Sequence, residues 1–267
     1  MLNMARFLMC PPDYFNIEYE INPWMRISNQ SDPIRARAQW EELYHVLTSD
    51  LGARVELLEP AKGLPDLVFT ANAGYVQGDL FVSSSFKYME RRGETPVFNK
   101  WFQAHGYRVA ELSPGCVFEG AGDALPLGDT IFAGYCHRSE MCSHQELSEV
   151  TKRRVLSLEL VEPKFYHLDT CFCPLDARSA LYFPRAFDPY ANTVLAEAVP
   201  GLLAVSERSA HRFACNAVVA GETVITNTGC DDLRNPLAER GYRLRMVELS
   251  EFMKSGGSAK CLTLRLD

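Results

Sequence analysis

The sequence predicts an α/β fold in which five strand–hairpin–helix units close into a ring, a pseudo-fivefold αβ propeller. Two observations lead to this prediction. A short apolar phrase recurs along the chain, and a second phrase with the pattern of a β-hairpin follows each copy after a loop. One position near the start of each hairpin also recurs at separations of 51, 46, 47 and 45 residues; in order it holds Asn72, Asp123, Asp169, Asn216 and Cys261.

The apolar phrase starts with glycine or arginine and usually ends at an acidic residue. Its copies are GARVELLEP from Gly52, GYRVAELSP from Gly106, RRVLSLELVEP from Arg153, GLLAVSE from Gly201 and GYRLRMVEL from Gly241. Short apolar runs bounded by glycine or proline are typical of strands, so each copy is predicted to be one strand.

The second phrase predicts a hairpin, because two apolar runs flank turn signals such as QGD, LGD and AGE. Four hairpins are expected within residues 71–85, 121–135, 168–184 and 214–228. The fifth is expected to form from the two ends of the chain, with AKCLTLRLD at residues 259–267 pairing with ARFLMCPP at residues 5–12.

Helices are predicted between hairpins and strands. In residues 32–52 apolar side chains recur at helical spacing, with Ser31 or Asp32 as N-cap and Gly52 past the end. Similar segments are residues 95–106, 143–153, 188–201 and 231–241. No linker or low-complexity segment interrupts the pattern, so residues 1–267 are predicted to form one domain.

Composition narrows the classes of function. Of 267 residues, 47% are hydrophobic, and 27 basic against 34 acidic residues give a formal net charge of −7. No basic stripe suggests nucleic-acid binding, and a small cationic substrate suits this charge. No stretch is long enough to span a membrane, and the N-terminus has no signal-peptide pattern, so a cytoplasmic location is expected.

The nine cysteines fit that location, because their number is odd and several lie in strand-like runs. Cys171 and Cys173 form a C-x-C pair on one face of a predicted strand. Two core thiols explain this pair better than a zinc site does. No metal site is predicted.

The ring has a consequence for function, because the loop between strand and hairpin has the same place in every unit. All five loops are expected to meet at one end of the ring. Each polar residue in them has a structural explanation of its own, such as a core histidine, a packed thiol or a turn carboxylate. Their convergence favours a site built from Asp66, Asn72, Glu119, Asp123, His167, Asp169 and Cys261.

These residue types indicate nucleophilic catalysis. A cysteine thiolate is a strong nucleophile, and a neighbouring imidazolium favours its formation. Several carboxylates in one pocket repel each other unless a cation binds among them. A guanidinium is planar, always charged and rich in N–H donors. The pattern therefore predicts a guanidino compound that is attacked at its central carbon.

The motifs INPWM, PDLVFTANAG, FEGAGDAL, GYCHRSE, FYHLDTCFCPL and GGSAKCLTLR together resemble the amidinotransferase, or pentein, superfamily. This superfamily contains arginine deiminases, dimethylargininases and amidinotransferases. The resemblance runs from the N-terminal RFLMCPP segment to the C-terminus. It is greatest to the catalytic domain of ammonia-forming arginine dihydrolases of the cyanobacterial type.

The resemblance implies a role for each matching residue. Cys261 would be the nucleophile, and His167 the acid and base that protonates the departing ammonia and then activates water. Glu119 would orient His167 or hold the substrate, while Asp123 and Asp169 would bind the guanidinium.

Three further residues would hold the amino-acid end of the substrate. Arg138 and Arg91 would take the α-carboxylate, with Asn22 nearby. A solvated charge beside Arg92 is the alternative for Arg91. The glycines before Cys261 would supply backbone contacts and mobility.

Asn72 distinguishes the subtypes, because deiminases resembling this chain carry an aspartate there. A neutral amide holds a guanidinium less strongly but accepts a ureido group better. This favours a dihydrolase that attacks its citrulline-like first product again and yields ornithine, two ammonia and carbon dioxide. The resemblance implies no metal and no organic cofactor. The C-terminal domain linked to ornithine-to-proline chemistry in the best-known dihydrolases does not follow here, so that activity is not expected.

The alternatives remain a dimethylargininase, an arginine deiminase that stops at citrulline, and a catalytically silent pentein that binds a partner. A cysteine protease fits less well, because the site is too acidic for a neutral peptide. The expected partner is a small molecule, L-arginine or a related guanidino compound, and a homo-oligomer is compatible with the sequence.

Overall fold

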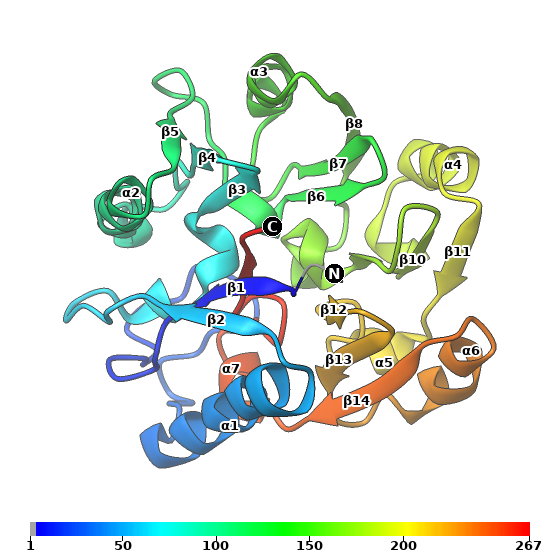
Figure 1. The fold of residues 1–267 in the computed structure, drawn as a ribbon, viewed down its shortest axis with the longest axis horizontal. Coiled ribbons are helices and arrows are strands. Elements are labelled where there is room, and N and C mark those ends of the chain that lie inside the picture. The colour runs from blue at the N-terminus through cyan, green and yellow to red at the C-terminus, as the bar shows by residue number, and fades with distance from the viewer. Residues whose placement is uncertain (1–3) are drawn as a thin grey trace.

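The computed structural model describes residues 4–267, and its five three-stranded sheets surround one axis (Figure 1). Each sheet combines an antiparallel pair with a third strand parallel to its neighbour. In chain order of the antiparallel pairs, the sheets are β3 (Gly74–Gln77), β4 (Leu80–Ser83) and β5 (Arg108–Ala110); β6 (Ala124–Leu127), β7 (Thr130–Tyr135) and β8 (Arg154–Glu159); β9 (Phe172–Pro174), β10 (Ser179–Tyr182) and β11 (Gly201–Ala204); β12 (Val218–Ala220), β13 (Thr223–Asn227) and β14 (Arg243–Val247); and β15 (Leu264–Arg265), β1 (Arg6–Met9) and β2 (Arg54–Leu57). The predicted fold class is confirmed.

Helices lie on the outside of the ring (Figure 1). One helix follows the second strand of each antiparallel pair; these helices are α1 (Pro33–His45), α2 (Glu94–Ala104), α3 (Met141–Thr151), α4 (Pro189–Ala198) and α6 (Arg234–Ala238). Asp32 caps α1, because its side chain accepts hydrogen bonds from the amides of Ile34 and Arg35. Two short helices, α5 (Glu207–Ala210) and α7 (Ser250–Met253), lie in loops.

The recurring strand phrase belongs to the sheet of the hairpin that precedes it. Strand β5, for example, pairs in parallel with β4, with Phe81 opposite Val109. A helix between two parallel neighbours is the usual right-handed crossover, and it brings the chain back to the same sheet. Packing fixes this return, since the ring of Phe102 in α2 stacks on Phe81 at 3.6 Å between centroids.

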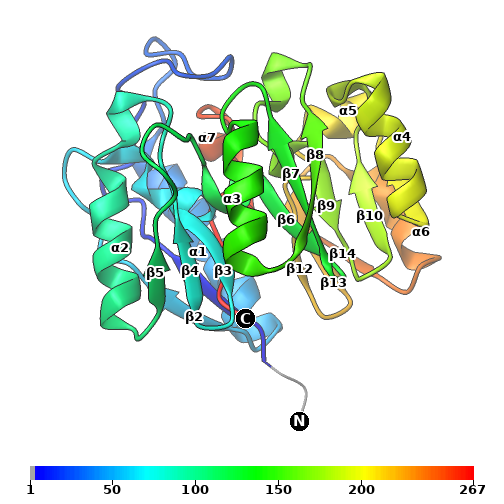
Figure 2. The ribbon, with the colours of Figure 1, turned by 90° about the horizontal axis from the view of Figure 1, so that it is seen from above.

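The two ends of the chain close the ring, as predicted. Strand β1 pairs antiparallel with β15, with Phe7 opposite Arg265. The C-terminus therefore lies at one end of the ring axis, while α7 and the segment after β1 lie at the other (Figure 2). No helix in residues 4–267 is long and apolar enough to cross a membrane.

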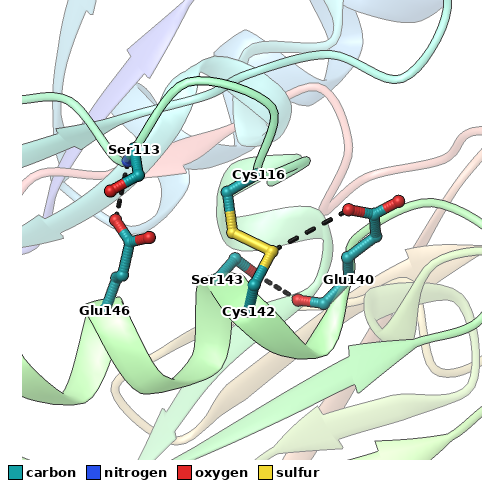
Figure 3. The surroundings of a disulfide bond; sticks show 6 residues. All are labelled: Ser113, Cys116, Glu140, Cys142, Ser143 and Glu146. Carbon is teal, nitrogen blue, oxygen red and sulfur yellow. Dashed lines mark hydrogen bonds between the residues drawn. A yellow bond between two sulfur atoms is a disulfide. The ribbon is translucent and has the colours of Figure 1, made fainter.

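One pair of cysteines differs from the expectation of free thiols. Cys116 and Cys142 form a disulfide that joins the loop before β6 to the first turn of α3, with Cα atoms 6.0 Å apart (Figure 3). Beside it, the amide of Ser113 donates to the Glu146 carboxylate at 2.7 Å. The sequence gives no signal for this pair, because 26 residues separate the partners and only the fold brings them together.

Candidate active site

The loops before the hairpins meet at the end of the ring that holds α7. Short 3-10 turns precede β3, β6 and β9, and they contact one another. Asn72, in the first turn, donates through Nδ2 to the carbonyl oxygen of Glu119 at 3.4 Å. His167 precedes the turn before β9, and its Nε2 lies 2.7 Å from Oε2 of Glu119, which precedes the turn before β6.

Gly122 makes this close approach of the turns feasible. A Cβ at this position would lie 2.4 Å from Asn72 Nδ2 and 3.2 Å from His167 Nδ1. Any side chain there would overlap two predicted site residues, so the glycine is required for space.

Asn216 fixes the predicted nucleophile Cys261. Its Oδ1 accepts hydrogen bonds from the amides of Ser258 at 3.0 Å and Cys261 at 3.1 Å, and its Nδ2 lies 3.0 Å from Cys261 Sγ. The same Nδ2 donates to the carbonyl of Asp169 at 3.1 Å. The sequence marks Asn216 only as a repeat position, yet this side chain organises the loop that contains Cys261.

The thiol of Cys261 points at the carboxylate of Asp169, with Sγ 3.5 Å from Oδ2. Both groups are buried. Burial and the neighbouring carboxylate raise the pKa of Cys261 well above its usual value, and burial raises the pKa of Asp169 to about 6. These two effects outweigh the opposing charge of Lys260 and favour the neutral thiol over the thiolate.

Glu119 stands between His167 and Arg138. Its Oε2 accepts from Arg138 Nη1 at 2.8 Å as well as contacting His167. Burial alone would raise the pKa of Glu119, but the Arg138 guanidinium and the hydrogen bond with His167 outweigh it and hold the pKa below its usual range. His167 Nδ1 is buried and has no hydrogen-bond partner among residues 4–267.

Arg138 is held on both faces of its guanidinium. The ring of Tyr88 lies 4.8 Å away and that of Tyr166 4.6 Å away, while Nη2 donates to the carbonyl of Ile21 at 3.0 Å. Arg138 lines two cavities, a narrow one that Cys261 also lines and an outer one that His137 and Lys87 line. Its guanidinium is therefore fixed at the boundary between them.

Arg91 is buried, so the solvated-charge alternative is wrong. It forms a two-point ion pair with Glu94 at 2.8 and 2.7 Å, and Nη1 donates to Asn72 Oδ1 at 2.8 Å. This last bond fixes which way the Asn72 amide faces. Burial raises the pKa of Glu94 to about 7, although the Arg91 charge opposes that rise.

Asp123 is buried, and both of its carboxylate oxygens already accept hydrogen bonds. Ser139 donates to Oδ2 through its amide and hydroxyl at 3.1 and 2.7 Å, and the amide of Leu168 donates to Oδ1 at 3.0 Å. Ser139 follows Arg138 and Leu168 follows His167. The structure places Asp123 where it ties these two segments together.

A narrow cavity lies in front of Cys261. Of the predicted site residues, those in its wall are Asn22, Asp66, Asn72, Arg91, Arg138 and Cys261, whereas Glu119, Asp123, His167 and Asp169 lie outside that wall. The cavity leaves about 10 Å³ for the centre of a water-sized sphere, which is room for about one water molecule. A substrate can therefore enter only if the covering segments move.

Asn22 belongs to those covering segments. Its Oδ1 accepts from the amides of Trp24 and Met25, and its Nδ2 donates to the carbonyl of Ser255 at 3.0 Å. The side chain thus joins the segment after β1 to the glycine loop before Cys261. In that loop Gly256 has φ +81° and its carbonyl accepts from the Tyr166 hydroxyl at 2.9 Å.

Asp66 also lines the cavity, and it carries a free acceptor. Oδ2 accepts from the Tyr19 hydroxyl at 2.9 Å, but Oδ1 is buried and has no partner among residues 4–267. Burial raises the pKa of Asp66, with the Arg91 charge opposing. A buried carboxylate oxygen without a partner is a binding point for a cationic N–H donor.

No group of three or more His, Cys, Asp or Glu side chains among residues 4–267 is arranged to hold a metal ion. Cys171 and Cys173, the C-x-C pair, are free and buried, as predicted for two core thiols. Cys171 lies near the carbonyl of Leu168 at 3.5 Å, and Cys173 near that of Ala217 at 3.6 Å.

Comparison with known proteins adds independent findings. A family model described as N,N dimethylarginine dimethylhydrolase, eukaryotic, matches residues 11–266. The bifunctional arginine dihydrolase/ornithine cyclodeaminase AgrE of Nostoc is 48% identical over all of this chain, which spans 38% of that longer protein. The N(G),N(G)-dimethylarginine dimethylaminohydrolase of Mycobacterium tuberculosis is 39% identical over 98% of this chain and 85% of its own length.

A solved structure has the same fold. The N-terminal domain of ArgZ, described as an arginine dihydrolase from the ornithine–ammonia cycle in cyanobacteria, superposes with a TM-score of 0.93 at 45% identity, over 98% of both chains. That structure is a cysteine variant bound to substrate. Another structure of the domain is described as covalently bound to a reaction intermediate.

Proposed function

The chain belongs to the N,N dimethylarginine dimethylhydrolase family, within the pentein superfamily that its motifs resemble, and from that premise we propose that it is an arginine dihydrolase. Its reaction converts L-arginine and two water molecules to ornithine, two ammonia and carbon dioxide. Cys261 is the nucleophile. The catalytic unit is one domain, residues 1–267.

The observation that carries the dihydrolase assignment is the amide of Asn72 in the wall of the cavity. Arg91 holds its Oδ1, so the Nδ2 side is directed away from that guanidinium. A neutral amide beside the nucleophile repels neither a guanidinium nor a ureido group. Both arginine and the ureido product can therefore occupy the same position in front of Cys261.

The substrate guanidinium adds positive charge beside Cys261, where the charge of Lys260 alone does not offset burial and the Asp169 carboxylate. Asp66 Oδ1 offers the guanidinium an acceptor in the cavity wall, and the Asp169 carboxylate, which contacts the Cys261 thiol outside that wall, adds negative charge close by. Its arrival lowers the pKa of the thiol, because the thiolate then has a cationic neighbour. The thiolate attacks the central carbon, a C–S bond forms, the C–N bond breaks, and ammonia leaves with a proton from His167.

Water then completes the first half of the reaction. His167, paired with Glu119, removes a proton from water, which attacks the covalent thiouronium carbon. The C–S bond breaks and the ureido product forms. In the second half Cys261 attacks the same carbon again, a second ammonia leaves, and water releases a carbamate that decomposes to ornithine and carbon dioxide.

The remaining predicted residues position these groups. Arg138, between two tyrosine rings, receives the substrate α-carboxylate at the outer edge of the cavity. Asn22 lies at the same edge. We assign Asp123 and Arg91 to positioning, because their hydrogen bonds are directed to other side chains and to backbone: Asp123 aligns the His167 and Arg138 segments, and Arg91 orients Asn72.

Dimethylargininase activity is the second candidate. The family model and the mycobacterial relative carry that name. It requires room for two methyl groups near Cys261 and releases dimethylamine with citrulline.

We further propose a cytoplasmic location. Seven free cysteine thiols are typical of a reducing compartment, although the one disulfide is not.

Product analysis tests the proposal. Purified protein is incubated with L-arginine labelled with carbon-13 at the guanidino carbon, and the label is followed by NMR while ammonia is counted. We expect the label to end in carbon dioxide, with two ammonia per ornithine, and no turnover by Cys261→Ser. The control Cys136→Ser, at an exposed free thiol, should keep full activity. Label that stops in citrulline overturns the dihydrolase assignment, and turnover of dimethylarginine alone supports the second candidate.

A further inference from the structure

A second, larger cavity occupies the centre of the ring at the end opposite the candidate active site. Strands β3, β6, β9, β12 and β15 each supply part of its wall, so all five sheets border it. Its volume is about 550 Å³. Sites for small organic ligands typically measure about 300–1,000 Å³.

Lys260 is the unusual feature of this cavity. It precedes Cys261, and its side chain lines the central cavity, whereas Cys261 lines the narrow one. The Nζ atom is buried, and among residues 4–267 it has no hydrogen-bond partner. A buried ammonium without an acceptor is unfavourable, so an anion or another acceptor in contact with it would be stabilised.

The other charges in the wall are already compensated. Arg265 forms a two-point ion pair with Asp267, with both distances 3.2 Å, and its Nη1 donates to the carbonyl of Val219. Asp176 accepts from the Tyr242 hydroxyl at 2.7 Å and from the Arg178 amide at 2.7 Å. Lys260 is therefore the one charged group in this wall for which the described chain provides no partner.

Many of the other lining residues are aliphatic or aromatic, Phe172, Ala217, Val218 and Leu264 among them, and polar groups supply about half of the exposed wall. Such a surface favours an organic body over a hydrated inorganic ion. One ammonium without a hydrogen-bond partner also matches a ligand with a single negative charge. A phosphate dianion would bring a second negative charge toward Asp169, whose carboxylate already attracts Lys260.

We propose that the central cavity is a binding site for a small organic monocarboxylate. Its carboxylate pairs with Lys260 Nζ, and its apolar body lies against the inner strands of the ring. This site is separate from the one that binds the guanidino substrate, and it does not depend on the proposed function.

The electrostatics of Lys260 agree with this ligand. Burial lowers the pKa of Lys260, and the Asp169 carboxylate only partly opposes that effect. A carboxylate in contact with Nζ restores the pKa, because it favours the charged form. Binding of the acid therefore holds Lys260 as an ammonium.

Isothermal titration of the full chain with sodium butyrate tests the proposal. We expect saturable binding by the unaltered protein, at least tenfold weaker binding by Lys260→Met, and partial recovery in Lys260→Arg. Lys62→Met, at an exposed lysine, is the matched control and should bind like the parent. Butyramide, which has the same shape without charge, and inorganic phosphate should both bind at least tenfold more weakly than butyrate.

Two further variants separate this site from the active site. Arg138→Gln removes the guanidinium proposed for the substrate carboxylate and should leave butyrate binding unchanged. Val219→Phe adds bulk to the wall of the central cavity and should weaken binding even if Lys260→Met fails to fold. Binding that is lost in Arg138→Gln but kept in Lys260→Met, or phosphate binding as tight as butyrate, overturns the proposal.

Discussion

At the scale of single residues, the most informative side chain is Asn72. Arg91 holds its Oδ1 at 2.8 Å, so the amide is a fixed part of the cavity wall. We expect Asn72→Asp to bind the guanidinium more strongly and the ureido group less well, since a carboxylate offers only acceptors. Citrulline should then accumulate, and the ratio of ammonia to arginine consumed should fall from two toward one.

The conservative variant Asn72→Gln is the control for this prediction. It keeps a neutral amide, so it should slow both steps and leave the product ratio near that of the parent. Chromatography of citrulline and ornithine during turnover checks the result. Ornithine as the main product of Asn72→Asp would show that this position does not select between the two steps.

Asp169, which contacts the Cys261 thiol, also affects the stability of the folded protein. Burial raises its pKa from 3.8 to about 6, so the folded protein holds this proton more tightly than the unfolded chain does. The resulting stability is complete below about pH 4 and is lost as pH rises through about 6. The loss is on the order of 3 kcal/mol for the unliganded protein.

We therefore expect Asp169→Asn to stabilise the unliganded protein at pH 7 while it abolishes turnover. The gain should disappear near pH 4, where the parent carboxyl is protonated in both states. Urea unfolding of parent and variant between pH 4 and 8 measures the difference. A difference in unfolding free energy that does not change with pH would contradict the assignment to this carboxyl group.

At the scale of secondary-structure elements, the contact between turns depends on Gly122. We expect Gly122→Ala to displace Asn72 and His167, because a Cβ would come within 2.4 Å of the Asn72 amide. A misplacement of this kind can lower kcat about 100-fold. Gly128→Ala is the comparison for general destabilisation, because its φ of +56° strains an alanine at a hairpin turn away from the site. Equal activities for the two variants would argue against a spatial role for Gly122.

The disulfide is a second device at this scale. It joins the loop three residues before Glu119 to the first turn of α3, shortly after Arg138 (Figure 3). A cross-link over 26 residues lowers the entropy of the unfolded chain, and in the chain-entropy model this raises the free energy of unfolding by about 3–4 kcal/mol. The double variant Cys116→Ser, Cys142→Ser should lose about that much unfolding free energy.

Urea unfolding with and without a dithiol reductant checks this prediction. The unfolding free energy of the parent should fall when the reductant is added. That of the double variant should be the same with and without reductant. Cys136→Ser, at an exposed free thiol, controls for general effects of cysteine loss. Parent protein with equal stability in both conditions would show that the cross-link contributes nothing.

At the scale of the whole molecule, repeated phrases are enough to predict the ring. Turn chemistry and apolar patterning are local, so they locate hairpins and helices from sequence alone. The closure of the ring by its two ends also follows, because AKCLTLRLD has no other partner in the repeat. The loops then meet and bring together residues that are distant in the sequence. Asn72 and Cys261, for example, line the same cavity.

What the sequence does not predict depends on contacts formed only in the folded ring. Each recurring strand, such as β5, pairs with the hairpin that precedes it in the chain. The order of strands and hairpins along the sequence does not show which hairpin a strand joins. Asp123 has the residue type of a cation ligand, but its oxygens are used by Ser139 and Leu168. Asn216 is marked only as a repeat position, because its side chain bonds the Cys261 loop across more than forty residues and no local pattern shows such a contact.

The covalent step is the central claim of this account, because it joins the fold, the site and the chemistry. Turnover with L-arginine is quenched in acid, and intact-protein and peptide mass spectrometry locate any adduct. We predict a species heavier by arginine less one ammonia, on the peptide that contains Cys261 and absent from Cys261→Ser. Turnover without an adduct on this peptide, or an adduct on another cysteine, would contradict the assignment of Cys261 as nucleophile.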